Sequence, residues 1–332
     1  MENKQYLVTI LVLAYNHENY ISQTIDSVLS QKTTFDYKIL ITEDASTDGT
    51  RSIVQDYMSR YPSRVFALLN EKNIGLNETL KRAIPLIDTK YTCILGGDDY
   101  WNDDNKLQMQ VEVLENDSSI TFVHTGFDVL DEAKNCIVPG INTWQWNMPK
   151  DRDKRLMSFL NHDFSTYPCS STCCFLSEPF QKCFKEHPQL LDYTVGEGTL
   201  LHVAMCMYGN KYMFMPNQTI VYRKRQNSLS HYQDKVKKLD YYMGYINLKI
   251  AAFKMFGIRE DDYWYVIKND INSNFKIAYR DNTLGRFREV VKSVDVDKTK
   301  SDLYDKVASN CIASFVYYWM IRGKSGLKAL CK

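Results

Sequence analysis

The sequence predicts an α/β fold built on a mostly parallel sheet. Strand-like apolar runs alternate with helical patterns over roughly the first 116 residues, in the order βαβαβαβα, and this alternation is typical of a doubly wound fold. The first run, residues 6–14, is almost continuously apolar and rich in β-branched residues, as expected for a strand covered on both faces. Strand, helix and strand follow within about 40 residues, which indicates a βαβ unit with a right-handed crossover.

The remaining elements of this half follow the same rhythm. The helix after the first strand shows apolar residues at offsets of four, seven and eight from Ile21, which is the spacing of one helical face. Pro85 ends a later helix, because proline lacks the donor that would continue it. The four expected strands lie at residues 6–14, 37–42, 65–69 and 91–95, and the helical patterns at 21–29, 53–58, 78–84 and 103–116.

Residues 117–230 are less regular, and the texture changes again after them. Strands are expected at 120–124, 169–176 and 212–215, and long helical patterns begin near residue 233. We therefore predict one α/β domain over residues 1–232, with halves at about 1–116 and 117–232. A helical C-terminal region is predicted over 233–332.

Composition excludes several classes of protein. The 332 residues are 44% hydrophobic and 24% charged, which is typical of a soluble globular chain. A net charge of +1, from 41 basic and 40 acidic residues, argues against a nucleic-acid partner. The nine cysteines form no CxxC pair and no secretory signal precedes the first strand, so we expect reduced cysteines in a cytoplasmic protein. No apolar run reaches the length of about 18 residues that a membrane-spanning helix needs.

The most informative motif is Gly96-Gly97-Asp98-Asp99, which directly follows the fourth strand. Ligands of α/β sheets bind at the carboxyl ends of the strands. Two adjacent carboxylates there are costly to desolvate unless a cation or hydrogen-bond donors meet them. Hard divalent metals often bridge such carboxylates to substrate phosphates. The turn therefore suggests a seat for a metal–diphosphate, although a solvated chain reversal would have the same sequence.

Four segments together resemble a known family. They are Val8-Thr9-Ile10-Leu11-Val12-Leu13-Ala14-Tyr15-Asn16, Glu43-Asp44-Ala45-Ser46-Thr47-Asp48-Gly49-Thr50, Asn73-Ile74-Gly75 and Gly97-Asp98-Asp99-Tyr100-Trp101. In this order and spacing they are similar to the family 2 glycosyltransferases of the GT-A fold. The resemblance covers residues 6–112 and continues more weakly to about 231.

The resemblance implies an inverting transfer of sugar from a nucleoside-diphosphate sugar, most often a UDP-sugar, to an acceptor hydroxyl in surface polysaccharide or glycan assembly. Tyr15 matches the tyrosine beside the nucleobase, and Asp44 matches the acid that recognises the base. Asp99 matches a direct ligand of Mn²⁺ or Mg²⁺ in a DXD-type motif, and Asp98 a partner of the ribose or metal. Glu197 matches the catalytic base. Residues 1–116 would then bind the nucleotide and residues 117–232 the acceptor.

Alternatives remain at several of these positions. Asp44 could cap a helix beginning near Ser46, and Glu197 could lie in a solvated turn, with Asp192 as the other candidate base. His231 could join the metal site or be structural. Arg223 and Arg225 could meet a diphosphate or be solvated. Tyr15 could instead pack in the core.

Two other functional classes are open at this stage. A sugar nucleotidyltransferase would need a Gly-rich basic loop after the first strand, which residues 14–18 do not supply. A noncatalytic sugar-nucleotide-binding or scaffolding protein would not need the acids at 44, 98 and 99.

The last segment of the sequence carries a separate signal. Residues 312–321 are nearly all apolar, and Arg322, Lys324, Lys328 and Lys332 follow with no acid after Asp305. This pattern suits peripheral contact with an anionic membrane, where lipid-linked acceptors would lie. A helix packed on the rest of the protein is the alternative.

Overall fold

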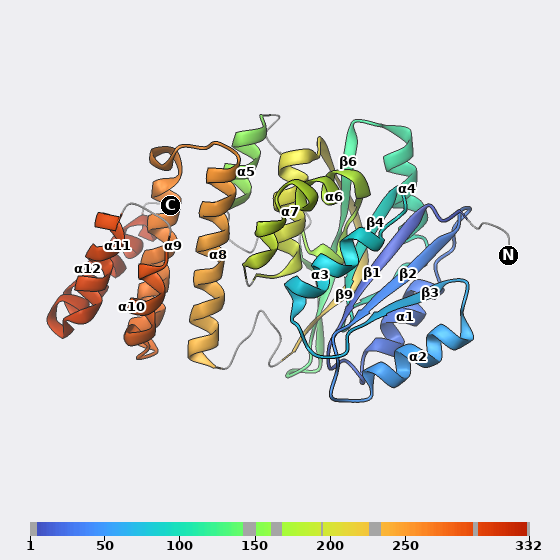
Figure 1. Ribbon diagram of the computed structural model, residues 1–332, viewed down its shortest axis with the longest axis horizontal. Helices are drawn as coiled ribbons and strands as arrows, with labels where there is room; N and C mark the ends of the chain where they lie inside the picture. Colours follow the sequence, from blue (N-terminus) through green and yellow to red (C-terminus); the bar gives the residue numbers. More distant parts are fainter. Residues whose placement is uncertain are drawn as a thin grey trace. The chain divides into compact units, whose positions relative to one another are not determined.

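The computed structural model describes residues 5–141, 151–160, 168–193, 195–225, 234–294 and 298–330. The chain divides into two compact units (Figure 1). The first comprises Met1–Asp192 with Gly196–Arg225, and the second comprises Tyr193–Val195 with Gln226–Lys332. The α/β fold with a helical C-terminal region is confirmed.

In the described residues of the first unit, nine strands form one mixed sheet. Its order is β3-β2-β1-β4-β8-β6-β9-β5, with β7 paired to β6 beside this path. Strands β1 to β4 are mutually parallel, whereas β8 runs antiparallel to both β4 and β6. The strands are β1 Val8–Ala14, β2 Tyr37–Glu43, β3 Val65–Leu69, β4 Tyr91–Gly96, β5 Tyr100–Trp101, β6 Ile120–Asp131, β7 Cys136–Ile141, β8 Cys174–Leu176 and β9 Lys211–Lys224.

The helices of this unit connect the strands. Right-handed crossovers place the helices after β1 and β2 on one face and the helix before β4 on the other, because the strand order reverses between β1 and β4. Ligands of open α/β sheets bind at such a reversal. The helices are α1 Ile21–Leu29, α2 Thr50–Arg60, α3 Leu76–Ala83, α4 Lys106–Asn116, α5 Arg152–Leu160, α6 Ser177–Glu186 and α7 Glu197–Tyr208, with short 3₁₀ turns η1 Ile84–Leu86, η3 Ser170–Thr172 and η4 Pro188–Asp192.

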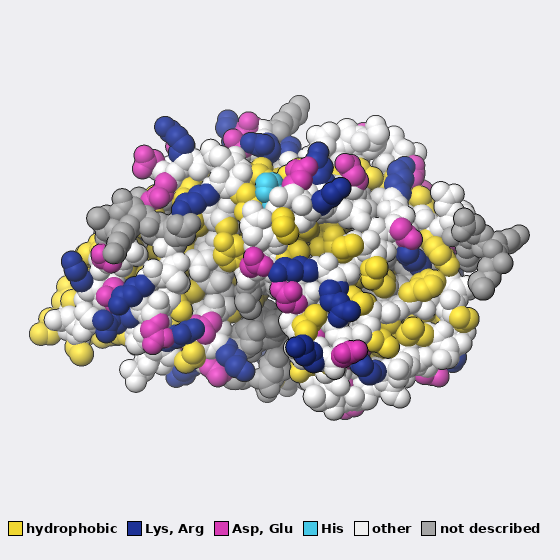
Figure 2. All heavy atoms as spheres, in the orientation of Figure 1, with side chains coloured by type: hydrophobic (Ala, Val, Ile, Leu, Met, Phe, Trp, Pro, Cys, Tyr) yellow, Lys and Arg dark blue, Asp and Glu magenta, His cyan; other side chains and the backbone are white. Residues whose placement is uncertain are grey.

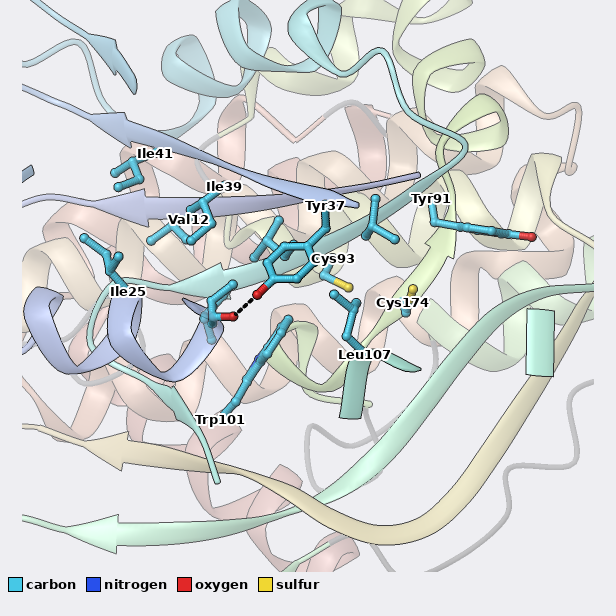
Figure 3. Packing of buried hydrophobic residues seen from close by; sticks show 14 of the residues in the cluster. Val12, Ile25, Tyr37, Ile39, Ile41, Tyr91, Cys93, Trp101, Leu107 and Cys174 are labelled. Carbon is cyan, nitrogen blue, oxygen red and sulfur yellow. Dashed lines mark hydrogen bonds between the residues drawn. The ribbon is translucent and has the colours of Figure 1, made fainter. Parts of the chain in front are cut away.

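The core of the first unit lies between β1, β2 and β4 and the helices that cover them. All seven residues of β1 are buried, which explains why its sequence lacks polar alternation. Figure 3 shows Tyr37 crossing this core toward Trp101, with its hydroxyl donating to the carbonyl of Val28 at 2.7 Å. Because this hydroxyl is satisfied, a tyrosine can stand in an otherwise apolar layer.

The second unit is helical in its described residues. Its packing is aromatic: Phe253 stacks on Tyr263 at 4.7 Å between ring centroids, and Phe275 meets Phe287 edge-on at 5.5 Å. Within the described ranges, none of the helices has the length and apolarity needed to cross a membrane. The helices are α8 Lys235–Met255, α9 Glu260–Arg280, α10 Leu284–Lys292, α11 Lys298–Ser309 and α12 Cys311–Leu330.

Several element predictions were wrong in part. The strands expected at 120–124 and 212–215 run on to Asp131 and Lys224. The predicted strand at 169–176 is a 3₁₀ turn followed by a strand of only three residues, because the amides of Thr172 and Cys173 donate locally to the carbonyls of Cys169 and Ser170. The helix expected near Ser46 begins at Thr50, where Asp48 accepts from the Thr50 amide at 3.0 Å. Asp44 is therefore not its cap.

Candidate active site

The Gly96–Asp99 turn lies where the strand order reverses, and neighbouring elements fix its backbone. The amide of Gly97 donates to the carbonyl of Leu13 at 2.8 Å, and Thr24 Oγ1 donates to the carbonyls of Gly97 and Asp99 at 3.0 and 2.7 Å. A Cβ atom on Gly97 would lie 2.6 Å from His17 Nδ1 and 2.8 Å from the Leu13 carbonyl. Glycine is required because the end of β1 approaches this closely.

Asp99 is buried, with 3% of its surface exposed. Its Oδ2 accepts from Ser171 Oγ at 2.7 Å, and its Oδ1 accepts from the backbone amide of Arg223 at 2.9 Å. Burial, and then the neighbouring Asp98 carboxylate, raise the pKa of Asp99 well above its usual range. Two hydrogen-bond donors therefore orient the carboxyl group, while burial disfavours its charged form.

Asp98 forms an ion pair with Arg225. Nε and Nη2 of Arg225 lie 2.7 and 2.6 Å from Oδ2 of Asp98, and Nη2 also lies 3.0 Å from His17 Nε2. Burial lowers the pKa of His17, which favours a neutral ring whose Nε2 accepts from Arg225. Arg225 and Arg223 are mostly shielded from solvent, so the alternative that they are solvated surface residues is wrong.

Glu197 begins helix α7 and lies close to the same turn. Ser170 Oγ donates to its Oε1 at 2.8 Å, while the next residue, Ser171, holds Asp99. The charge of Glu197 contributes to the raised pKa of Asp99, so the two carboxylates interact electrostatically. The amino end of a helix is also a favourable place for a carboxylate. The structure thus brings Asp98, Asp99 and Glu197 to one region.

The donor chemistry of this region fits a hard divalent cation. Carboxylate oxygens each carry two lone pairs, so both oxygens of Asp99 can still accept a bond. Within the described residues, Oδ1 of Asp98 has no hydrogen-bond partner. No group of three or more acidic, histidine or cysteine side chains with metal-site geometry occurs in the described part of the chain. Mg²⁺ sites often use one or two carboxylates and complete their shell with substrate phosphates and water.

Asp44 and Tyr15 lie at the ends of the neighbouring strands. Asp44 Oδ1 accepts from Asn70 Nδ2 at 2.8 Å and from the Ile74 amide at 3.0 Å, and Oδ2 accepts from the Gly75 amide at 2.8 Å. This carboxylate therefore orders the loop that contains the Asn73-Ile74-Gly75 motif. Tyr15 is 42% exposed, so it is not a core residue and its ring is accessible to a ligand.

The other candidates have different surroundings. Asp192 is an exposed residue whose Oδ1 pairs with Lys81 Nζ at 2.6 Å. His231 lies outside the described residues.

Three contributors to this site were not singled out from the sequence. His17, Ser170 and Ser171 are common polar residues with no motif spacing of their own. His17 had one signal, its place in the polar turn after β1. Ser170 and Ser171 had none, because the sequence predicts a strand over their segment.

The chain belongs to glycosyltransferase family 2, because the model of that family, described as "Glycosyl transferase family 2", matches residues 9–176. The resemblance stated from the motifs is confirmed. A Mycobacterium bovis protein named Mb1547, of uncharacterized function, is 27% identical over 234 residues, which are 69% of this chain and 63% of that protein.

A second relative carries a more specific name. The Escherichia coli protein WfgD, named a UDP-Glc:α-D-GlcNAc-diphosphoundecaprenol β-1,3-glucosyltransferase, is 32% identical over 126 residues, 38% of this chain and 47% of its own length. Both alignments span less than two thirds of the relative's own length.

Among solved structures, Staphylococcus aureus TarS residues 1–349 in complex with UDP-GlcNAc superpose with a TM-score of 0.59 at 14% identity. The match covers 94% of this chain and 89% of that one. At this identity the likeness shows a shared fold.

Proposed function

We propose that this protein is a metal-dependent, inverting glycosyltransferase that moves a sugar from a nucleoside-diphosphate sugar to an acceptor hydroxyl. The observation that carries the proposal is the meeting of Asp98 and Asp99 with Glu197 at the reversal of strand order. The carboxylates of Asp98 and Asp99 would hold the metal that neutralises the leaving diphosphate. The carboxylate of Glu197 would act on the acceptor hydroxyl.

On the donor side, Tyr15 would lie against the nucleobase and Asp44 would recognise it. Three hydrogen bonds hold the Asp44 carboxylate rigidly, and its Oδ2 retains acceptor capacity for a base N–H. Asp98 would contact the ribose or the metal, and Asp99 would hold the metal. A bound Mn²⁺ or Mg²⁺ supplies Lewis-acid neutralisation of the charge on the departing diphosphate.

On the acceptor side, Glu197 would take the proton of the attacking hydroxyl. The bond from acceptor oxygen to anomeric carbon forms as the bond to the diphosphate oxygen breaks, so the anomeric configuration inverts. Ser170 would fix the carboxylate through its hydrogen bond to Oε1, which leaves Oε2 to receive the proton. Asp192 is a weaker candidate, because it is exposed and paired with Lys81.

The substrate class is inferred from the relatives. WfgD is named for a UDP-glucose donor and a diphosphoundecaprenol-linked acceptor. We infer a UDP-sugar donor and a glycan or lipid-linked acceptor for this chain, in polysaccharide assembly. The described cysteines are free thiols, which suits a cytoplasmic enzyme.

The test is release of nucleoside diphosphate from a panel of UDP- and GDP-sugars, with and without Mn²⁺, using short glycan acceptors. Metal-dependent release of UDP with a new glycosidic bond of inverted configuration is expected. Formation of sugar nucleotide from sugar phosphate and nucleoside triphosphate would instead indicate a nucleotidyltransferase. Binding of UDP-sugars without turnover for any acceptor would indicate a noncatalytic binding protein.

A further inference from the structure

Helix α12 exposes an apolar stripe along one side. Ile312, Phe315, Val316, Trp319 and Met320 are between 48% and 77% exposed. Counted from Ile312, they lie at offsets of three, four, seven and eight, which is the spacing of one helical face. Figure 2 shows hydrophobic side chains gathered at the left edge, where Figure 1 draws α12.

The opposite side of α12 is already used for packing. Ser314 Oγ donates to the carbonyl of Val307 at 2.8 Å, Tyr317 Oη donates to Asn272 at 2.6 Å, and Tyr318 stacks on Tyr279 at 4.5 Å. Ile321 is buried. One face of the helix therefore packs against its unit, and the apolar stripe on the other face takes no part in that packing.

A positively charged segment continues from the stripe. The guanidinium of Arg322 lies 5.0 Å from the centroid of the Trp319 ring. Helix α12 runs on to Leu330 and carries Lys324 and Lys328, and no acidic residue follows Asp305 in the sequence. An apolar face with a tryptophan beside basic residues suits the headgroup level of an anionic bilayer.

We propose that α12 docks this unit on an anionic membrane surface, with the stripe inserted among the headgroups and Arg322, which borders it, paired with a lipid phosphate. A second copy of the chain is a poorer occupant for two reasons. Five side chains on about two helical turns are far fewer than the roughly 20 residues per side of a stable protein interface. Self-association through this stripe would also bring the basic segments of both copies toward the same interface. The inference does not depend on the proposed sugar chemistry.

The test is flotation of the full chain with vesicles of phosphatidylglycerol and phosphatidylcholine in equal parts, and with phosphatidylcholine alone, in the absence of any donor. The wild type should float with the anionic vesicles, and at 1 M salt or on neutral vesicles it should float much less. The variant Phe315→Ser/Val316→Ser/Trp319→Ser should bind at least tenfold more weakly. A matched control, Val236→Ser/Tyr265→Ser, removes exposed apolar side chains from α8 and α9 and should float like the wild type.

A second variant guards against misfolding. Arg322→Gln/Lys324→Gln/Lys328→Gln keeps every apolar side chain of the stripe and should lose the preference for anionic vesicles, with an unchanged circular dichroism spectrum showing that it folds. Failure of the wild type to float, or equal flotation of all variants, would overturn the proposal. So would a dimer, seen by light scattering, that the stripe variant converts to monomer without any vesicle binding by the wild type.

Discussion

Ser171 donates from Oγ to Oδ2 of Asp99 at 2.7 Å, and its neighbour Ser170 donates to Oε1 of Glu197 at 2.8 Å. One short 3₁₀ turn thus orients the carboxylate assigned to the metal and the carboxylate assigned to the acceptor. Consecutive residues fix the spacing between the two hydrogen bonds more tightly than separate elements would.

Replacing Ser171 should impair the role of Asp99 in metal binding, and replacing Ser170 should impair the role of Glu197 toward the acceptor. Ser171→Ala should raise the KM for the sugar donor by roughly tenfold. The loss of one hydrogen-bond donor to the buried Asp99 carboxylate costs about 1–3 kcal/mol of free energy. Ser170→Ala should lower kcat while the donor KM stays near normal. The control is Ser177→Ala, which removes a buried hydroxyl bonded to Thr92 and should leave both constants unchanged. Identical kinetic effects of the Ser170 and Ser171 variants would argue against the separate assignments.

Glu197→Gln should lower kcat by about 100-fold or more, the usual scale for the loss of a general base, with donor affinity retained. Steady-state turnover and calorimetric binding of donor together measure this. Asp192→Asn is the matched comparison and should have little effect, because Asp192 pairs with Lys81 at the surface. A larger loss from Asp192→Asn than from Glu197→Gln would transfer the role of base to Asp192.

Two buried histidines should make the fold acid-sensitive. Burial lowers the pKa of His124 to about 3 and that of His202 to about 4. The unfolded chain therefore binds more protons than the folded one as pH falls below about 6.5. Stability from these histidines is present above pH 6.5 and is lost as pH falls toward 4 and then 3, by about 2 kcal/mol per histidine at pH 5.

Urea unfolding at pH 8 and pH 5 measures this dependence. The substitution His202→Gln keeps a donor for the Pro168 carbonyl and should remove about half of the difference between the two pH values. An unchanged difference in the variant would show that other groups cause the acid sensitivity.

Much of the first unit could be predicted from the sequence because its strands are local signals. The run at residues 65–69 is bounded by polar residues on both sides and forms β3 over the predicted range. The sequence wrongly predicts a strand for the segment before β8, because local hydrogen bonds fold Ser170–Thr172 into a 3₁₀ turn despite its strand-like composition.

The contacts within the site are tertiary and left little trace in the sequence. Arg225 lies 127 residues from Asp98 along the chain, and Ser171 lies 72 residues from Asp99. The location of Asp98 and Asp99 at the end of a strand could be predicted from the sequence, because a parallel sheet gathers the carboxyl ends of its strands at one edge. The pairing of the later strands β8 and β9 brings Ser171 and Arg225 to those carboxylates, and no local sequence pattern specifies that pairing.

The central claim is that Asp98 and Asp99 seat a metal-bound diphosphate, and calorimetric titration of UDP in Mn²⁺ or in EDTA tests it most directly. We predict binding in Mn²⁺ that weakens at least tenfold in EDTA. In Asp99→Asn, which should stay folded by circular dichroism and lose turnover, the Mn²⁺-dependent part should disappear. Equal UDP affinity with Mn²⁺ and with EDTA, or an Asp99→Asn variant with near-normal Mn²⁺-dependent binding, would contradict the account.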